Sequence, residues 1–201
     1  QAREAVEAAV GVSIPSDRML VGHSERWLDL RGIPIQDLSC LTEFPLTALY
    51  LNSTSLQDLS PLAGMPLKKL KINGTQVADI RPLRDMPLEL LHMWETSVVS
   101  IAPLRGLPLR DLNIEGLDIH DISPLKGMPL ETLSLSATSI TNIQVLAGVD
   151  LIELRLDCRL VDEGAVENLM KLPNLTRLVI PGHWTTIDAL RKHPGLRYLS
   201  H

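Results

Sequence analysis

A repeat of 21 residues restricts the fold of this 201-residue chain more strongly than any other feature of its sequence. Each unit opens with Leu-x-x-Leu-x-Leu, in which the last position also accepts Ile or Met. Successive units start at Leu46, Leu67, Leu88, Leu109, Leu130 and Leu151. A unit of 24 residues then leads to Leu175, and a partial repeat begins at Leu196. One unit earlier, Glu25 occupies the first position ahead of Leu28 and Leu30.

The period predicts a solenoid of parallel strands. Alternation of apolar and polar residues gives each unit one short strand with a buried face. One unit cannot bury its leucines alone, so stacking of units has to complete the core. Prolines recur inside and at the end of the units, and they leave only about five residues for the segment opposite the strand. We therefore expect short 3₁₀ turns there, with Ser or Asp before the proline as cap.

These motifs resemble the leucine-rich repeat superfamily, over about 85 % of the chain. The 21-residue unit is similar to the repeats of bacterial internalins and of the phosphatase-regulating leucine-rich repeat protein. Residues Asp121 to Leu130 resemble repeats of planctomycete-type bacterial proteins, which often stand beside predicted kinase domains, although no kinase motif occurs here. The resemblance implies an α/β solenoid, a right-handed superhelix with a parallel sheet on the concave face and 3₁₀, helical or turn segments on the convex face.

The chain divides into an N-terminal cap (1–24) and a leucine-rich repeat domain (25–201). In the cap we expect a helix over Ala2–Val10 and a hairpin-like segment around Pro15 to Asp17. The long unit predicts a helix from Asp162 through Lys171, and the next unit a helix from Thr186 to His193. A threonine column (Thr54, Thr75, Thr96, Thr138) is interrupted by Ile33 and Leu117. The final strand, from Leu196, has no covering element in the sequence, so self-association through this edge is an alternative.

Composition excludes several classes of protein. The chain is 45 % hydrophobic, and this content excludes intrinsic disorder, although only 3 % of the residues are aromatic. Its apolar runs are too short for insertion into a membrane. A net charge of −5 without a basic stripe argues against nucleic acid as a partner.

Cys40 and Cys158 stand six strand spacings apart, about 29 Å, whereas a disulfide needs Cα atoms within about 7 Å. Free thiols and the lack of a signal segment favour the cytoplasm, and an extracellular location stays open.

The concave face holds the main indication of function. Four of the six aromatic residues fall in the columns between the inward leucines: Trp27, Tyr50, Trp94 and Tyr198. Exposed Trp and Tyr side chains are typical of interface hot spots. The predicted partner-binding residues are Trp27, Asp29, Tyr50, Lys69, Lys71, His92, Trp94, Asp111, Asn113 and Glu115. A peptide or protein with an apolar anchor between unlike charges would suit this face.

Catalytic and metal chemistry finds no support in the sequence. The six histidines show neither zinc-ligand spacing nor His-Glu-x-x-His, so we expect no metal and no cofactor. His92 and Glu115 could suggest acid–base catalysis, but no nucleophile and no sequence signature of a pocket accompany them. Asp37, Asp58, Asp79 and Asp121 recur once per unit, which indicates turn capping.

The sequence therefore predicts a non-enzymatic module that binds a protein or peptide partner through the concave sheet, as a regulatory domain of a larger bacterial protein. A secreted or surface adhesion protein of internalin type is the first alternative. A structural arm that oligomerises through its C-terminal edge is the second. An enzyme is the reading with least support, because no catalytic constellation accompanies His92.

Overall fold

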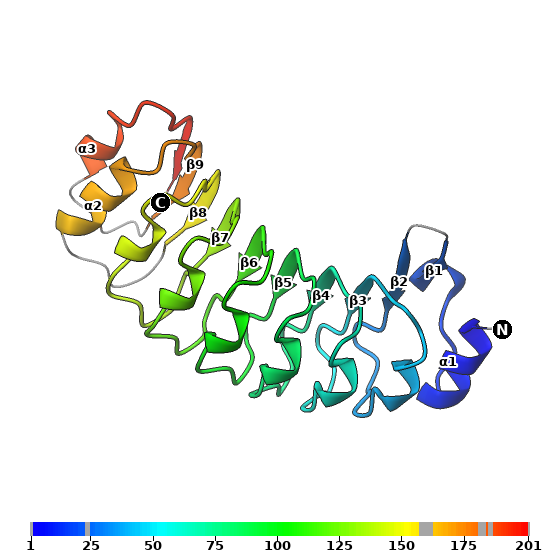
Figure 1. Cartoon of the computed structure of the whole chain (residues 1–201). Coiled ribbons are helices and arrows are strands. Elements are labelled where there is room, and N and C mark those ends of the chain that lie inside the picture. Colours follow the sequence, from blue (N-terminus) through cyan, green and yellow to red (C-terminus); the bar gives the residue numbers. More distant parts are fainter. Residues whose placement is uncertain (1, 23–24, 157–162, 181–183, 185–186, 201) are drawn as a thin grey trace.

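Ten strands in one sheet make up the inner face of the molecule. The computed structural model describes residues 2–22, 25–156, 163–180, 184 and 187–200. Within them the strands follow chain order from one end of the sheet to the other. They are β1 (Met19–Val21), β2 (Arg26–Asp29), β3 (Ala48–Tyr50), β4 (Lys69–Lys71), β5 (Leu90–His92), β6 (Asp111–Asn113), β7 (Thr132–Ser134), β8 (Glu153–Arg155), β9 (Arg177–Val179) and β10 (Tyr198–Ser200). The sheet lines the concave side of an arc (Figure 1).

The strands from β2 to β10 are parallel and stack in the register of the repeat. Leu28 of β2 pairs with Leu49, and Leu49 pairs with Leu70, so equivalent positions lie side by side. These central leucines have no exposed surface. Each points into a core that runs the length of the arc, because a strand turns alternate side chains to opposite faces. The predicted parallel solenoid is confirmed.

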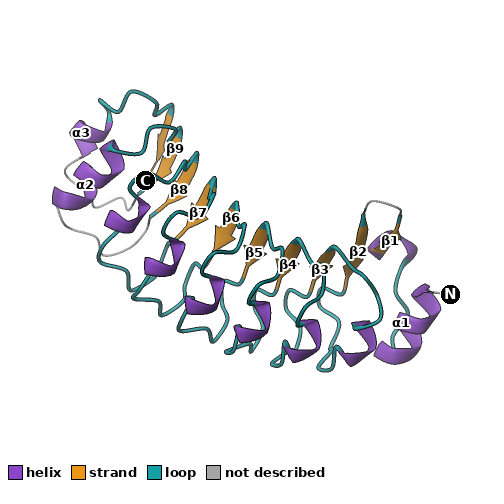
Figure 2. Cartoon of the chain, in the orientation of Figure 1, coloured by secondary structure: helices purple, strands orange, loops and turns teal. Residues whose placement is uncertain are grey.

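Short 3₁₀ turns form the convex side, as the sequence predicts (Figure 2). They span Ser39–Leu41, Ser60–Leu62, Arg81–Leu83, Ala102–Leu104, Ser123–Leu125 and Gln144–Leu146. The last residue of each turn is a buried leucine that closes its layer from below. In four of these turns a proline stands in the first positions, where its missing N–H leaves no helical bond unmade.

The aspartate that stands ahead of four of the six turns supplies the cap. Asp58 Oδ1 accepts the Ser60 backbone N–H at 2.8 Å, and Asp121 Oδ1 accepts that of Ser123 at 2.7 Å. In the two units without an aspartate, Ser100 Oγ accepts the Ala102 N–H at 3.3 Å and Asn142 Oδ1 accepts the Gln144 N–H at 2.7 Å. The predicted capping role of the aspartates is confirmed. The serine before the proline donates its own N–H to this bond and does not cap the turn with its hydroxyl.

Two turns in each of the five units from Leu46 to Leu130, and one turn in the unit before them, use left-handed backbone. Directly after the strand, φ is positive at Gly32, Ser53, Gly74, Glu95, Gly116 and Ala137. At the end of the convex turn, φ is positive at Gly64, Asp85, Gly106, Gly127 and Gly148. Glycine adopts this conformation without strain, whereas Ser, Glu, Asp and Ala do so at some cost in free energy. The repeat geometry, and not the local residue, therefore imposes these turns.

The column threonines bond within their own units. Thr75 Oγ1 donates to the Ile72 carbonyl at 2.6 Å, and the other three column threonines donate to the equivalent carbonyl. In the unit without a threonine that begins at Glu25, the Ile33 backbone N–H donates to the Leu30 carbonyl at 3.0 Å. The carbonyl that ends the strand thus finds a donor in either case. The four hydroxyls bond within their layers and not between them, so there is no hydroxyl ladder for Ile33 or Leu117 to interrupt.

The N-terminal cap closes one end of the core. Helix α1 (Ala2–Val10) occupies the predicted span and buries Val6 completely. A 3₁₀ turn over Ser16–Arg18 leads into β1, which pairs antiparallel with β2. The hairpin partner of β1 is therefore β2 and not the segment 12–14. Ile14 of that segment has no exposed surface and packs into the leucine core.

The C-terminal units carry α-helices where the sequence predicts them, but the second helix ends at Leu190 and not at the predicted His193. Helix α2 (Glu163–Met170) and the shorter α3 (Ile187–Leu190) lie on the convex side. The predicted cap Asp162, the predicted helix start Thr186 and Cys158 lie outside the described residues. His193 follows α3 and is only 5 % exposed. Its Nε2 lies 3.0 Å from the Leu172 carbonyl and its Nδ1 accepts the Gly195 N–H, so it joins two neighbouring units.

None of the helices in the described part of the chain has the length and apolar character needed to cross a bilayer.

Candidate partner-binding face

The side chains between the buried leucines form two rows across the concave sheet. The first row runs Trp27, Ala48, Lys69, Leu90, Asp111, one residue from each of β2 to β6. The second row runs Asp29, Tyr50, Lys71, His92, Asn113. The sheet bonding continues one step beyond the strands, where the Gly74 N–H donates to the Trp94 carbonyl at 3.0 Å. Trp94 and Glu115 therefore stand at the end of the same face. The structure brings all ten predicted residues onto five neighbouring strands and the turns after them.

Two adjoining hollows open on this face at its N-terminal end, and together they are called the N-terminal hollow. One, of about 390 Å³, is lined by Glu25, Trp27, Thr47, Ala48, Tyr50, Lys68, Lys69 and Glu89. The other, of about 460 Å³, is lined by Asp17, Glu25, Trp27, Asp29, Arg31, Tyr50, Asn52 and Lys71. Trp27 and Tyr50 belong to both, and each ring is half-buried. The rings thus form the shared wall of the hollow.

Asp29 has a structural partner within its own turn. It is 5 % exposed, and its carboxylate accepts the Arg31 backbone N–H at 3.0 Å. The carboxylate also accepts hydrogen bonds from Nε of the Arg31 guanidinium at 2.9 Å and from Nη2 at 2.6 Å. Burial opposes ionisation of Asp29, but the hydrogen bonds and charge of Arg31 outweigh it, so the pKa lies below its usual value. The Arg31 side chain remains 59 % exposed and carries the outward surface of this pair.

Lys69 and Lys71 project from β4 beside the rings. Lys69 is exposed, and the Lys71 Nζ lies 5.9 Å from the centre of the Tyr50 ring. Among the described residues, neither ammonium group has a carboxylate within ion-pair distance. Lys68, on the rim, differs because it pairs with Glu89 at 2.9 Å. Two cations of the face are therefore available to meet a ligand.

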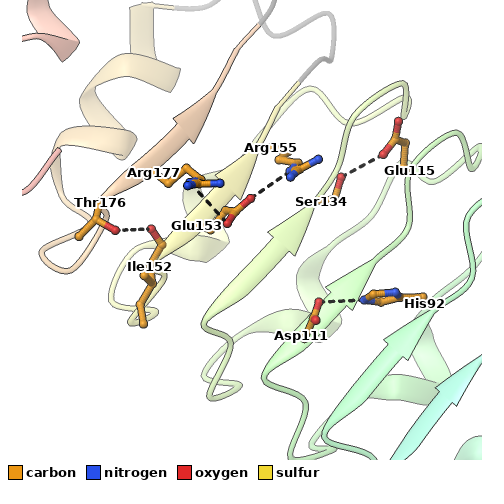
Figure 3. A network of polar contacts seen from close by, with 9 residues as sticks. All are labelled: His92, Asp111, Glu115, Ser134, Ile152, Glu153, Arg155, Thr176 and Arg177. Carbon is orange, nitrogen blue, oxygen red and sulfur yellow. Dashed lines mark hydrogen bonds and ion pairs between the residues drawn. The ribbon is translucent and has the colours of Figure 1, made fainter. Parts of the chain in front are cut away.

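The next strands carry predicted residues that already bond one another (Figure 3). His92 Nε2 lies 3.1 Å from Asp111 Oδ1, with both side chains partly exposed. Glu115 Oε2 accepts the Ser134 hydroxyl at 3.4 Å. Asn113 Oδ1 accepts the Glu115 backbone N–H at 2.9 Å, which holds the turn after β6. These groups shape the face, and they offer a ligand fewer free atoms than the lysines do.

The C-terminal half of the sheet is self-paired. Glu153 bonds Arg155 at 3.0 Å and approaches Arg177 at 3.8 Å, and Figure 3 shows Glu153 between the two arginines. The Arg177 guanidinium lies 4.9 Å from the centre of the Tyr198 ring. Tyr198 is 53 % exposed, and it lines neither part of the N-terminal hollow. The fourth concave ring thus stands apart from Trp27 and Tyr50.

Several lining residues are absent from the predicted set. Asp17 comes from the cap, and Glu25 precedes β2, so neither belongs to the columns. Asn52 does belong to a column, and its Oδ1 is buried without a hydrogen-bond partner among the described residues. The columns flag Asn52, Arg31 and Ala48 as surface positions, but the repeat pattern alone carries no signal for Asp17.

Other surface features offer weaker chemistry. A hollow of about 500 Å³ lies on the convex side between two 3₁₀ turns, lined largely by exposed residues such as His120, Ser123 and Lys126. In the described ranges, no three His, Cys, Asp or Glu side chains gather in a way that would hold a metal ion. Cys40 is a free thiol, and partial burial raises its pKa, which makes the reactive thiolate scarcer.

Comparison with solved structures agrees with the architecture. The chain is similar to internalin C2 of Listeria monocytogenes, with 21 % identity over 100 % of this chain and 92 % of that chain and a TM-score of 0.76. It is similar to internalin F of the same organism, with 22 % identity over 98 % of this chain, 74 % of that chain and a TM-score of 0.63. No protein-family model and no curated protein sequence gives a significant match. The chain has the leucine-rich repeat fold.

Proposed function

We propose that this chain, a leucine-rich repeat solenoid, is a non-enzymatic module that binds a protein or peptide partner on its concave face. The observation that carries the proposal is the pair of half-buried rings, Trp27 and Tyr50, that together wall the N-terminal hollow. Such rings bury large rigid areas on binding at little cost in side-chain entropy. The rest of the predicted set, from Lys69 to Glu115, extends the face along the next strands.

The polar groups support binding rather than catalysis. His92 is held by Asp111, and Glu115 is held by Ser134 and the turn of Asn113. In the N-terminal hollow, the Thr47 hydroxyl is bonded to the Arg26 backbone and Lys68 is paired with Glu89. An adhesion protein of internalin type would use the same face, so this alternative concerns the location of the chain and not the site.

Panning of a displayed library of random 12-residue peptides on the immobilised chain tests the proposal. We expect enrichment by the wild type, and its loss, by about tenfold or more, when Trp27→Ala and Tyr50→Ala are combined, because hot-spot rings contribute about 2 kcal/mol or more each. The matched control is Tyr198→Ala, which removes an exposed ring at the far end of the same sheet and should leave enrichment unchanged.

Urea denaturation of all three proteins separates lost binding from lost folding. Peptides that still enrich on the folded double variant, or that are lost equally on Tyr198→Ala, would contradict the placement of the site.

A further inference from the structure

The N-terminal hollow is charged differently on its two sides, and this pattern points to the chemistry of the partner. We propose that the bound segment is acidic, with a carboxylate over Lys69 and Lys71 and an apolar side chain between the rings of Trp27 and Tyr50. This rests on the proposed function and specifies the ligand of the same face.

Among the described residues, neither lysine of β4 has a carboxylate within ion-pair distance, and three carboxylates on or beside the neighbouring strands are bonded to other groups. In the second row, Asp29 lies two strands from Lys71 and is bound by Arg31 through both of its carboxylate oxygens. In the first row, Asp111 lies two strands from Lys69 and is bound to His92 at 3.1 Å. Two strand spacings are about 10 Å between backbones, and among the described residues neither carboxylate lies within ion-pair distance of a β4 ammonium group.

The third nearby carboxylate, Glu89, is also engaged. It pairs with Lys68 at 2.9 Å, and this hydrogen bond lowers its pKa, while the charges of Arg110 and Lys69 act on it from farther away. The rim therefore neutralises itself through Lys68 and Glu89, and the two lysines inside it stay available. Two ammonium groups without carboxylate partners attract an anion to the hollow. The binding free energy is most favourable when the anion becomes partly desolvated on binding.

The opposite side of the hollow is negative. Asp17 and Glu25, both exposed, line it on the side of the cap and β2. A segment with an acidic residue is repelled there and attracted over β4, so the field fixes the direction in which the segment lies. A basic residue of the partner placed near Glu25 would add to this orientation.

The apolar part of the hollow has matching dimensions. Trp27, Ala48 and Tyr50 occupy β2 and β3, one to two strand spacings from β4, which is about 5 to 10 Å. Side chains two positions apart on an extended chain are about 6.8 Å apart and point the same way. An extended segment therefore satisfies both halves when its apolar and acidic residues are two positions apart.

Three displayed peptide libraries test the proposal, each with a fixed Leu, one random residue and then Glu, Gln or Lys, within random flanks. On the wild type we expect the Glu library to enrich about tenfold over the Gln library, and the Lys library to fall below both. Combined Lys69→Glu and Lys71→Glu should reverse the order of the Glu and Lys libraries. Lys126→Glu, a charge reversal on the convex side, should leave the order unchanged.

The two proposals fail in different ways. Equal enrichment of the Glu and Gln libraries, with loss on the ring variant, would overturn the acidic partner and leave the binding face in place. The same conclusion follows if the order survives both charge reversals on β4. Absence of any enrichment that depends on Trp27 and Tyr50 would overturn both proposals.

Discussion

At the scale of single residues, this chain tolerates non-glycine side chains at positions where the repeat imposes a left-handed backbone conformation. Ala137 takes φ of 55° after β7, where the equivalent residues one unit and three units earlier are Gly116 and Gly74. An L side chain in this region costs about 1 kcal/mol, since its Cβ approaches the backbone. The equivalent positions thus differ in strain and not in shape.

Replacement of Ala137 by glycine should therefore stabilise the chain. We expect a gain of about 0.5 to 1 kcal/mol in the free energy of unfolding, measured by urea denaturation, less the added chain entropy of glycine when unfolded. The matched control is Gly127→Ala, at φ of 71° with open space where the added methyl group would lie, which should destabilise by a similar amount. A loss of stability in Ala137→Gly would show that the left-handed turn is not strained.

At the scale of the element, the aspartate-capped 3₁₀ turn is a recurring part of the chain that responds to acid. Hydrogen bonds lower the pKa of Asp37, Asp58, Asp79 and Asp121. For the first three, the side-chain bond from the residue two positions later is the larger cause and its backbone N–H the next. For Asp121 the backbone bond from Ser123 comes first and the side-chain bond second. The ionised caps are therefore favoured by folding.

Because the folded pKa lies below the usual value of about 3.9, the caps stabilise the chain fully above that value and lose this contribution as pH falls through the folded values. A variant with all four aspartates replaced by asparagine keeps the acceptor that Asn142 already provides, but it cannot titrate. We expect its urea midpoint to fall less than that of the wild type between about pH 5 and about pH 2.5. Parallel midpoints in the two proteins over this range would contradict the role of the caps.

At the scale of the whole molecule, stability depends on contacts between neighbouring units. Leu112 of β6 has no exposed surface and sits between Leu91 and Leu133 of the adjoining strands. Leu199 of β10 occupies the same position in a strand that pairs only with β9 among the described residues, and it is half-buried. In a solenoid each layer contacts only its neighbours, so a central layer contributes through two interfaces.

Leu112→Ala should thus be much more damaging than Leu199→Ala. For the central change we expect a loss of about 2 to 5 kcal/mol in the free energy of unfolding, because it removes buried area and leaves a cavity. The terminal change should cost clearly less. Hydrogen exchange should show protection lost in β5 and β7 for the central variant and confined to β9 for the terminal one. Equal losses in the two variants would contradict nearest-neighbour stacking.

The sequence by itself determined the solenoid, its parallel sheet and its convex 3₁₀ turns. These follow from a pattern of leucine, proline and aspartate that recurs along the chain. It also placed the residues of the concave columns, since side-chain alternation along a strand is local. Only the tertiary structure decided which of those residues are engaged. Asp29 is bound by Arg31 and Asp111 by His92, whereas Lys69 and Lys71 have no partner within ion-pair distance in the described chain.

The position of the hollow was likewise decided by the tertiary structure. The cap lies outside the repeat, so the period of the repeat could not predict that β1 pairs with β2 or that Asp17 lines the same hollow as Trp27. The physical reason is the range of the interactions. Strand and turn geometry, and the Asp29–Arg31 pair, depend on residues a few positions apart. The His92–Asp111 and Lys68–Glu89 pairs and the wall of the hollow depend on side chains from different units, about 20 residues apart in the chain.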